Sequence, residues 1–254
     1  MPYLDVWRRR VEMAGETRRE RQKNKLIRDI ERLTPDSLSY KTIVVDGEER
    51  QAIVTSSDAY NLKNFISLPG ETIPFGAMIQ YADRHWLVRE KEIDDEIYAK
   101  CQGQLCNVLM RWQDADGEIL EYYGVGEDAT KYSSGVLNGS DYMITLGEFQ
   151  IKVALPVNED TAVIHRDMRF LIDADSFLDT LQDAGMHPTA FKVTRRNIVT
   201  GTFGDEGYVE ITLVEDRFID GKDDEENGLA YQPEGNAGTD TDTGADAGEG
   251  SEWL

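Results

Sequence analysis

Apolar residues recur along the chain with two different spacings, and the first of them is helical. A short helix that Gly15 ends is predicted from one face formed by Leu4, Trp7, Val11 and Ala14. A second helix over 16–33 is predicted from the stripe Leu26, Ile27, Ile30 and Leu33. Thr34-Pro35 should end it, because the residue before a proline is disfavoured in the helical region. The chain is therefore expected to begin with a helical arm.

From Ser39 onward the apolar spacing changes to two, which is typical of strands with one buried face. Asp46-Gly47 is a hairpin turn signal between two such runs. Further strands are predicted from the alternating segments CNVLMRW, EILEYYGV, EFQIKVAL and YVEITLVE. Within the body only residues 176–184 are typical of a helix. The fold class expected is mainly β, with N-terminal α-helices followed by antiparallel β barrel or sandwich lobes.

A weak internal repeat divides the body into two β lobes. Trp86-x-Val88-x4-Ile93 recurs as Phe191-x-Val193-x4-Ile198, 105 residues later, and at the same offset Cys106 and Val108 match Ile211 and Leu213. Chance alternation could also produce this likeness. The predicted organisation is a basic helical arm (1–35), a first β lobe (36–156), a second β lobe (157–219) and an acidic tail (220–254).

Charge is distributed unevenly over these parts. The arm holds ten basic and six acidic residues, the tail eleven acidic and one basic, and the body carries −16 of the chain's net −22. An acidic body repels phosphate, which excludes a general nucleic-acid binder and simple electrostatic attachment to anionic lipid. The 254 residues also contain no apolar run of the roughly 18 needed for a membrane span.

The tail has almost no large apolar residue, so we expect it to be disordered in solution. It ends in Trp253-Leu254, which could anchor on a neighbouring protein or be incidental to a solubilising tail. The basic helix could likewise be a solvated face or an arm that reaches an acidic partner. The candidate partner-binding residues are Trp7, Arg8, Arg9, Arg10, Arg18, Arg19, Trp253 and Leu254.

Catalytic and metal-binding patterns are weak in this sequence. His85, His165 and His187 have no ligand spacing, and Cys101 and Cys106 are expected to be free thiols in a reducing compartment, since the N-terminus lacks a secretory core. There is no Gly-x-Ser-x-Gly elbow and no phosphate loop. Asp173 and Asp175 could act in an acid-dependent hydrolase, but acid pairs are common in so acidic a chain. We expect no enzyme activity, no cofactor and no metal.

Several segments together are similar to a known group of proteins. A basic helix leads into SLSYKTIVVDGEERQAIVT, then PGETIPFGAMIQYADRHWLVREKEIDDEIYAKCQGQLCNVLMRWQDADGEI, and the body closes with AFKVTRRNIV and GYVEITLVEDRF. This resembles the head-to-tail connector, neck or head-completion proteins of tailed bacteriophages, over about residues 16–219. The resemblance implies a virion structural protein, assembled in the host cytoplasm, that forms a ring below the portal protein.

Elementary physics is compatible with such a ring. An acidic lumen lets duplex DNA pass without specific binding, and copies can close a ring by head-to-tail contact. We therefore expect a homo-oligomer of six or twelve copies that contacts the portal and other neck or tail proteins, with no membrane attachment. The alternatives are another virion role, as a tail, baseplate or head-decoration protein, and a DNA-binding module that uses the basic arm.

Overall fold

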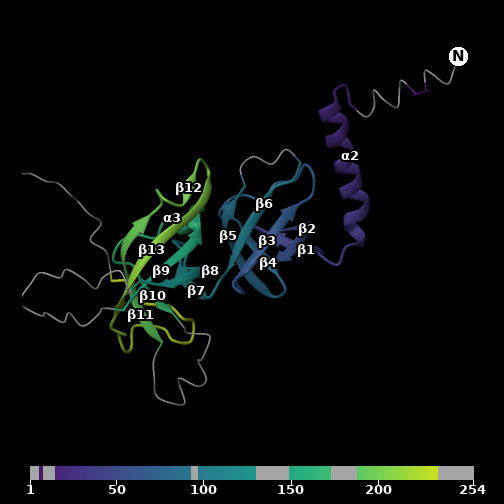
Figure 1. Ribbon diagram of the computed structural model, residues 1–254. Helices are drawn as coiled ribbons and strands as arrows, with labels where there is room; N and C mark the ends of the chain where they lie inside the picture. Colours follow the sequence, from purple (N-terminus) through teal and green to yellow (C-terminus); the bar gives the residue numbers. More distant parts are fainter. Residues whose placement is uncertain (1–5, 8–14, 93–96, 130–148, 173–187, 234–254) are drawn as a thin grey trace, which may run out of the picture.

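A computed structural model describes residues 6–7, 15–92, 97–129, 149–172 and 188–233 (Figure 1). Over these residues the protein is mainly β, with an N-terminal helix followed by two antiparallel β sheets. The helical part consists of α2 (Arg18–Leu33) and the short 3-10 helix η1 (Thr34–Asp36). Thr17 caps α2, because its side chain accepts from the backbone N–H of Glu20 while the Glu20 side chain accepts from the Thr17 backbone. The predicted helix and its end at Thr34-Pro35 are confirmed.

The first sheet is a closed barrel of six strands. Its members are β1 (Tyr40–Val45), β2 (Glu48–Ser56), β3 (Leu62–Ser67), β4 (Met78–Tyr81), β5 (Arg84–Lys91) and β6 (Lys100–Leu105). The strand order around the barrel is β1-β2-β3-β6-β5-β4, and β4 pairs with β1 to close it. Asp46 and Gly47 form the predicted β1–β2 turn, and both have positive φ, as a tight hairpin turn requires.

The second sheet is formed by the later strands. Its members are β7 (Val108–Gln113), β8 (Ile119–Asp128), β9 (Gln150–Pro156), β10 (Arg169–Ile172), β11 (Thr189–Asn197), β12 (Thr202–Phe203) and β13 (Glu206–Asp216). The order is β10-β11-β13-β9-β8-β7, with β12 paired to β13, and the edge strands β10 and β7 lie beside each other. The short helix α3 (Glu159–Ala162) connects β9 towards β10. The sheet is thereby rolled around its own core.

The two sheets have the same topology and the same strand register. If β1 to β5 are replaced by β7 to β11, and β6 by β13, the first strand order becomes β7-β8-β9-β13-β11-β10. This is the second strand order read from its other end. Residues also pair alike: Val88 opposes Gly103 in the first sheet, as Val193 opposes Leu213 in the second. Along the other edge of β6 and of β13, Phe65 opposes Cys101 as Val153 opposes Ile211. The body therefore contains the same six-stranded arrangement twice in succession.

A β-bulge occurs at the equivalent place in each unit. The register of β5 shifts between Val88 and Glu90, and that of β11 shifts between Val193 and Arg195. The part of the sequence repeat that aligns Trp86 and Val88 with Phe191 and Val193 is therefore confirmed. The extension to Cys106 and Val108 is wrong. The strand that matches β13 is β6. Matching residues are separated by different spans, because Val88 and Gly103 lie 15 positions apart whereas Val193 and Leu213 lie 20 apart, so one constant offset cannot hold.

The closing strands use equivalent positions with larger side chains in the second unit. Val45 pairs with Ile79 in the first barrel, and both side chains are buried. The equivalent residues in the second unit are Trp112 and Phe170, whose rings meet edge to face with centroids 6.0 Å apart. The face predicted for the 106–112 segment is confirmed for Met110 and Trp112, which are fully buried.

Strand pairing changes from one sheet to the other at Cys106 and Asn107, earlier than the expected division at residue 156. Strands β7, β8 and β9 pair with β13 and its neighbours, so they belong to the second unit. The alternating pattern is equally regular on both sides of the change, which is why it does not mark the boundary. Ala154 alternates along β9 with the buried Val153 and Leu155, so a spacing of two predicts that it faces solvent. It is instead buried between the two sheets.

The acidic tail begins with a folded segment. Residues 217–233 follow β13 and lie against β10, where Arg169 donates hydrogen bonds to Asp223 and to the Tyr231 carbonyl. Asp223 is buried, so the expectation that everything after residue 220 is disordered is wrong for residues 220–233. Residues 234–254 and the helix predicted over 176–184 lie outside the described residues. Of the helix predicted before Gly15, only Val6 and Trp7 are described, and both are helical.

Candidate functional site

The helix α2 projects from the first barrel as an arm (Figure 1). None of its residues is buried, and seven basic residues outnumber three acidic ones along it. Arg18 and Arg19 lie at its N-terminus, where the helix dipole disfavours positive charge. Their position therefore does not stabilise the isolated helix through its dipole.

Only part of the predicted partner-binding set can be placed. Arg18 and Arg19 are exposed, and Trp7 has 57% of its surface exposed. The remaining members lie outside the described residues: Arg8, Arg9, Arg10, Trp253 and Leu254. Arg18 and Arg19 are neighbours at the start of α2, whereas Trp7 belongs to a separate described stretch that precedes the helix.

The apolar side of α2 is uncovered over much of its length. Leu26 and Leu33 are 46% and 58% exposed, and Ile27 and Ile30 are only partly covered. A helix with one apolar stripe and one charged side is the kind that packs against another surface. The stripe is the one predicted from the spacing of apolar residues, but that spacing does not show that the body leaves the stripe uncovered.

The two barrels meet at a close-packed joint. Leu87 of β5 is buried against Val125 of β8 and Ala154 of β9, with Met78, Cys106 and Tyr208 packed around them. The β5 bulge places Arg89 in this joint, where it pairs with Glu127 and lies 5.2 Å from the ring centroid of Tyr208. Bulges commonly redirect a side chain in this way.

Polar contacts of Glu206 also connect the two barrels at the joint. Glu206 accepts hydrogen bonds from the backbone N–H of Phe75 and from the Lys91 ammonium group, at 2.8 and 2.9 Å. These contacts lower the pKa of Glu206, so the carboxylate stays charged in the joint. Charge pairs and apolar packing therefore act together in the contact between the two barrels.

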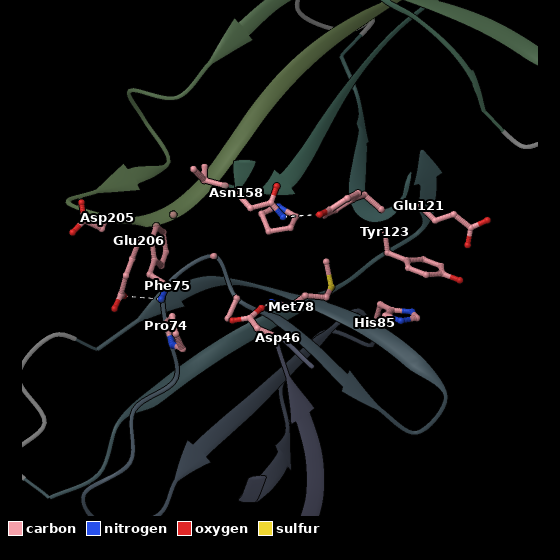
Figure 2. Close-up of a pocket in the computed structure, with 16 residues that line it drawn as sticks. Asp46, Pro74, Phe75, Met78, His85, Glu121, Tyr123, Asn158, Asp205 and Glu206 are labelled. Atoms are coloured by element: carbon pink, nitrogen blue, oxygen red, sulfur yellow. Dashed lines mark hydrogen bonds between the residues drawn. The ribbon is translucent and has the colours of Figure 1, made fainter. Parts of the chain in front are cut away.

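A groove of about 600 Å³ opens beside the joint, and we call it the inter-barrel groove (Figure 2). It is lined from both barrels, among others by Asp46, Phe75, Met78, His85, Glu121, Tyr123, Asn158, Asp205 and Glu206. His85 stacks on Tyr123 with ring centroids 3.7 Å apart, and burial lowers the pKa of this imidazole. Figure 2 shows Asp205 and Glu206 at one end of the groove and His85 at the other.

The carboxylates of the inter-barrel groove are largely engaged within the chain. Glu121 accepts from Arg111 at 2.7 Å, and Glu206 is held by Lys91. Asp46 accepts from the backbone N–H of Met78 at 2.8 Å, and burial raises its pKa. General acid–base chemistry needs its groups within reach of one reacting atom. The arrangement is instead that of a structural joint with an open side.

A larger groove of about 900 Å³ lies at the end of the second barrel, and we call it the end groove. It is formed by the β7–β8 turn, α3 with the loop after it, and Gln232-Pro233. Leu120, Val163 and Met168 provide apolar surface, and Val163 is 54% exposed. Asp114, Asp116 and Glu159 stand around them, and within the described part of the chain none of the three forms an ion pair.

The contact between the tail segment and β10 depends on one buried arginine. Arg169 donates from Nε to Asp216 and from both terminal nitrogens to Asp223. Burial alone would raise the pKa of Asp223, but hydrogen bonds from Arg169, Ile219 and Tyr231 outweigh it and lower that pKa. The segment is therefore fixed to the sheet by charge and by backbone hydrogen bonds.

The described residues contain no group of three or more His, Cys, Asp or Glu side chains placed to hold a metal ion. His165 is close to the Val163 carbonyl, at 3.0 Å from Nδ1, whereas His187, Asp173 and Asp175 lie outside the described residues. Cys101 and Cys106 are unlinked, as predicted. Within the same residues, no helix has the length and apolar character to cross a bilayer.

Comparisons with known proteins provide no relative. No family model, no curated protein and no solved structure matches the chain.

Proposed function

We propose that the protein is a virion structural component of a tailed phage, which forms a ring in the neck between the portal and the tail. The resemblance over residues 16–219 motivates this proposal. The observation that supports it best is the separation of an exposed basic helix from a body of opposite charge. Such a division favours contacts between copies, and it leaves an acidic surface that DNA can pass without binding.

The duplicated barrel supports the same proposal. Each chain presents two units of one topology that pack against each other, so six copies would present twelve similar units around an axis. Head-to-tail contacts between copies close into a ring when a whole number of the rotations from one copy to the next adds up to a full turn. In this proposal the chain acts through packing and charge, and DNA passes through without specific binding.

The test is to locate the chain in particles. A short epitope tag inserted at Val199, which is 84% exposed between β11 and β12, would be visualised by electron microscopy of virions with a bound antibody fragment. Label at the neck in six or twelve copies is expected. Label on the capsid surface, along the tail or at the baseplate would overturn the neck assignment, and absence from particles would overturn a virion role altogether.

A DNA-binding module using the basic arm is the second candidate, and the exposed arginines of α2 favour it. Binding of duplex DNA through several phosphate contacts should fall steeply with salt, with a log–log slope of roughly −0.9 per contact. We expect little binding even at about 50 mM salt, because the body repels phosphate. Tight binding with a steep slope, abolished by Arg18→Ala with Arg19→Ala, would favour the DNA-binding function instead.

A further inference from the structure

The contact between the two barrels cannot simply be repeated between copies. In the first barrel this contact uses the neighbouring residues Met78 and Leu87. Their equivalents in the second barrel are Arg169 and Lys192, and Arg169 is covered by residues 217–233. Copies that assemble therefore need a different contact surface.

The arm α2 offers one half of such a contact. Its apolar side is open at Leu26 and Leu33, and residues 18–33 carry a net charge of +4. Lys23, Lys25 and the arginines flank this side, so a partner surface should combine an apolar floor with acidic edges.

The end groove has that combination. Val163 and Leu120 provide an apolar floor, and Asp114, Asp116 and Glu159 are carboxylates without a cationic partner in the described residues. The inter-barrel groove is a weaker match, because Glu121 and Glu206 already pair with Arg111 and Lys91.

We propose that α2 of one copy docks in the end groove of the next copy, with its apolar side on Val163 and its basic residues against the acidic edge. The arm projects beyond the first barrel, and the groove belongs to the second barrel on the opposite side of the joint (Figure 1). The contact is therefore head to tail, which is the type that builds rings. It rests on the proposed function only in that a neck ring requires contacts between copies.

Complementation between two variants of the full chain tests the contact. Leu26→Asp with Leu33→Asp disables the arm, and Val163→Lys disables the groove; all three side chains are exposed, so folding should be preserved. In sedimentation experiments the wild type should associate, and each variant alone should lose at least about tenfold in affinity. An equimolar mixture of the two should form a heterodimer, because one intact arm and one intact groove remain.

Matched exposed substitutions provide the control. Leu38→Asp and Val199→Lys change residues that are 91% and 84% exposed outside both surfaces, and they should associate like the wild type. A wild type that stays monomeric, variants that associate normally, or a mixture that fails to pair would each overturn the contact. The neck assignment is decided separately by the position of the tag in particles, so either proposal can fail alone.

Discussion

Gly76 and Gly207 touch across the joint between the two barrels. A Cβ atom placed on Gly76 would lie 1.9 Å from the carbonyl oxygen of Gly207, and Gly76 has a φ of +81°. Only a residue without a side chain permits both the backbone conformation and this approach.

Gly76→Ala should therefore loosen the joint. We expect a loss of about 1–2 kcal/mol from the left-handed backbone and about 1–3 kcal/mol more from the clash, measured by urea unfolding. Gly70→Ala is the control, because Gly70 has a φ of +86° with nothing within 4 Å of the added Cβ. Equal losses in the two variants would show that the Gly76–Gly207 contact is unimportant.

Asp223 fixes the tail segment through the buried guanidinium of Arg169. Asp223→Ala removes the carboxylate that accepts from Arg169 and from the backbone of Ile219 and Tyr231. Breaking a buried ion pair costs about 3–5 kcal/mol. Because Arg169 keeps its bond to Asp216, we expect a loss of about 3 kcal/mol in thermal unfolding. Asp220→Ala changes an exposed acid of the same segment and should have little effect. A loss under about 1 kcal/mol for Asp223→Ala would show that the segment is not held by this pair.

Truncations separate the folded part of the tail from the rest. Removing residues 234–254 should leave the melting temperature nearly unchanged, because that stretch has almost no apolar side chains apart from Trp253-Leu254. Removing residues 221–254 should lower it, since Arg169 then loses Asp223. Calorimetry of the two truncated chains measures the difference, and identical melting temperatures would contradict it.

The fold class could be predicted from sequence because alternation reports directly which side chains are buried. Val209, Ile211 and Leu213 alternate in the sequence and are fully buried in β13. The pairing of strands could not be predicted in the same way, because alternation does not specify which strand lies beside which. The sequence pattern therefore places β7 to β9 in the first lobe, whereas they pair within the second sheet.

The grooves and the tail contact could not be predicted, for related reasons. The end groove joins Asp114 to Val163 and Pro233, residues that come together only when the second sheet rolls up. Asp223 lies in the acidic run DDEE, where no local feature distinguishes the buried member from its more accessible neighbours. Only the fold places Arg169 opposite it.

The two cysteines should be unreactive in the folded protein. Burial raises the pKa of both thiols to about 12, so little of the nucleophilic thiolate exists at neutral pH. Titration with a thiol reagent at pH 8 should give almost no fast reaction in buffer and two reacting groups in denaturant. Rapid native labelling of Cys101 or Cys106 would mean that the barrel or the joint opens readily.

Asp46 should make the protein less stable as the pH rises. Burial raises its pKa, so the folded state holds the proton more tightly than the unfolded state. By linkage, its contribution is most favourable below the ordinary value of 3.8 and is lost as pH rises through the folded pKa. Asp223 behaves oppositely: its lowered pKa gives stability above 3.8 that is lost as pH falls.

Asp46→Asn should accordingly stabilise the protein at pH 7. Asparagine has no charge to desolvate, its side-chain oxygen can still accept from Met78, and it tolerates the positive φ of 49° at this turn. In urea unfolding the variant should exceed the wild type at pH 7, and the gain should shrink towards pH 3. Asp83→Asn is the matched control, because Asp83 also has a positive φ, of 56°, in an exposed turn. A gain that is independent of pH, or one equal to that of the control, would assign the effect to turn geometry and contradict the role of the Asp46 charge.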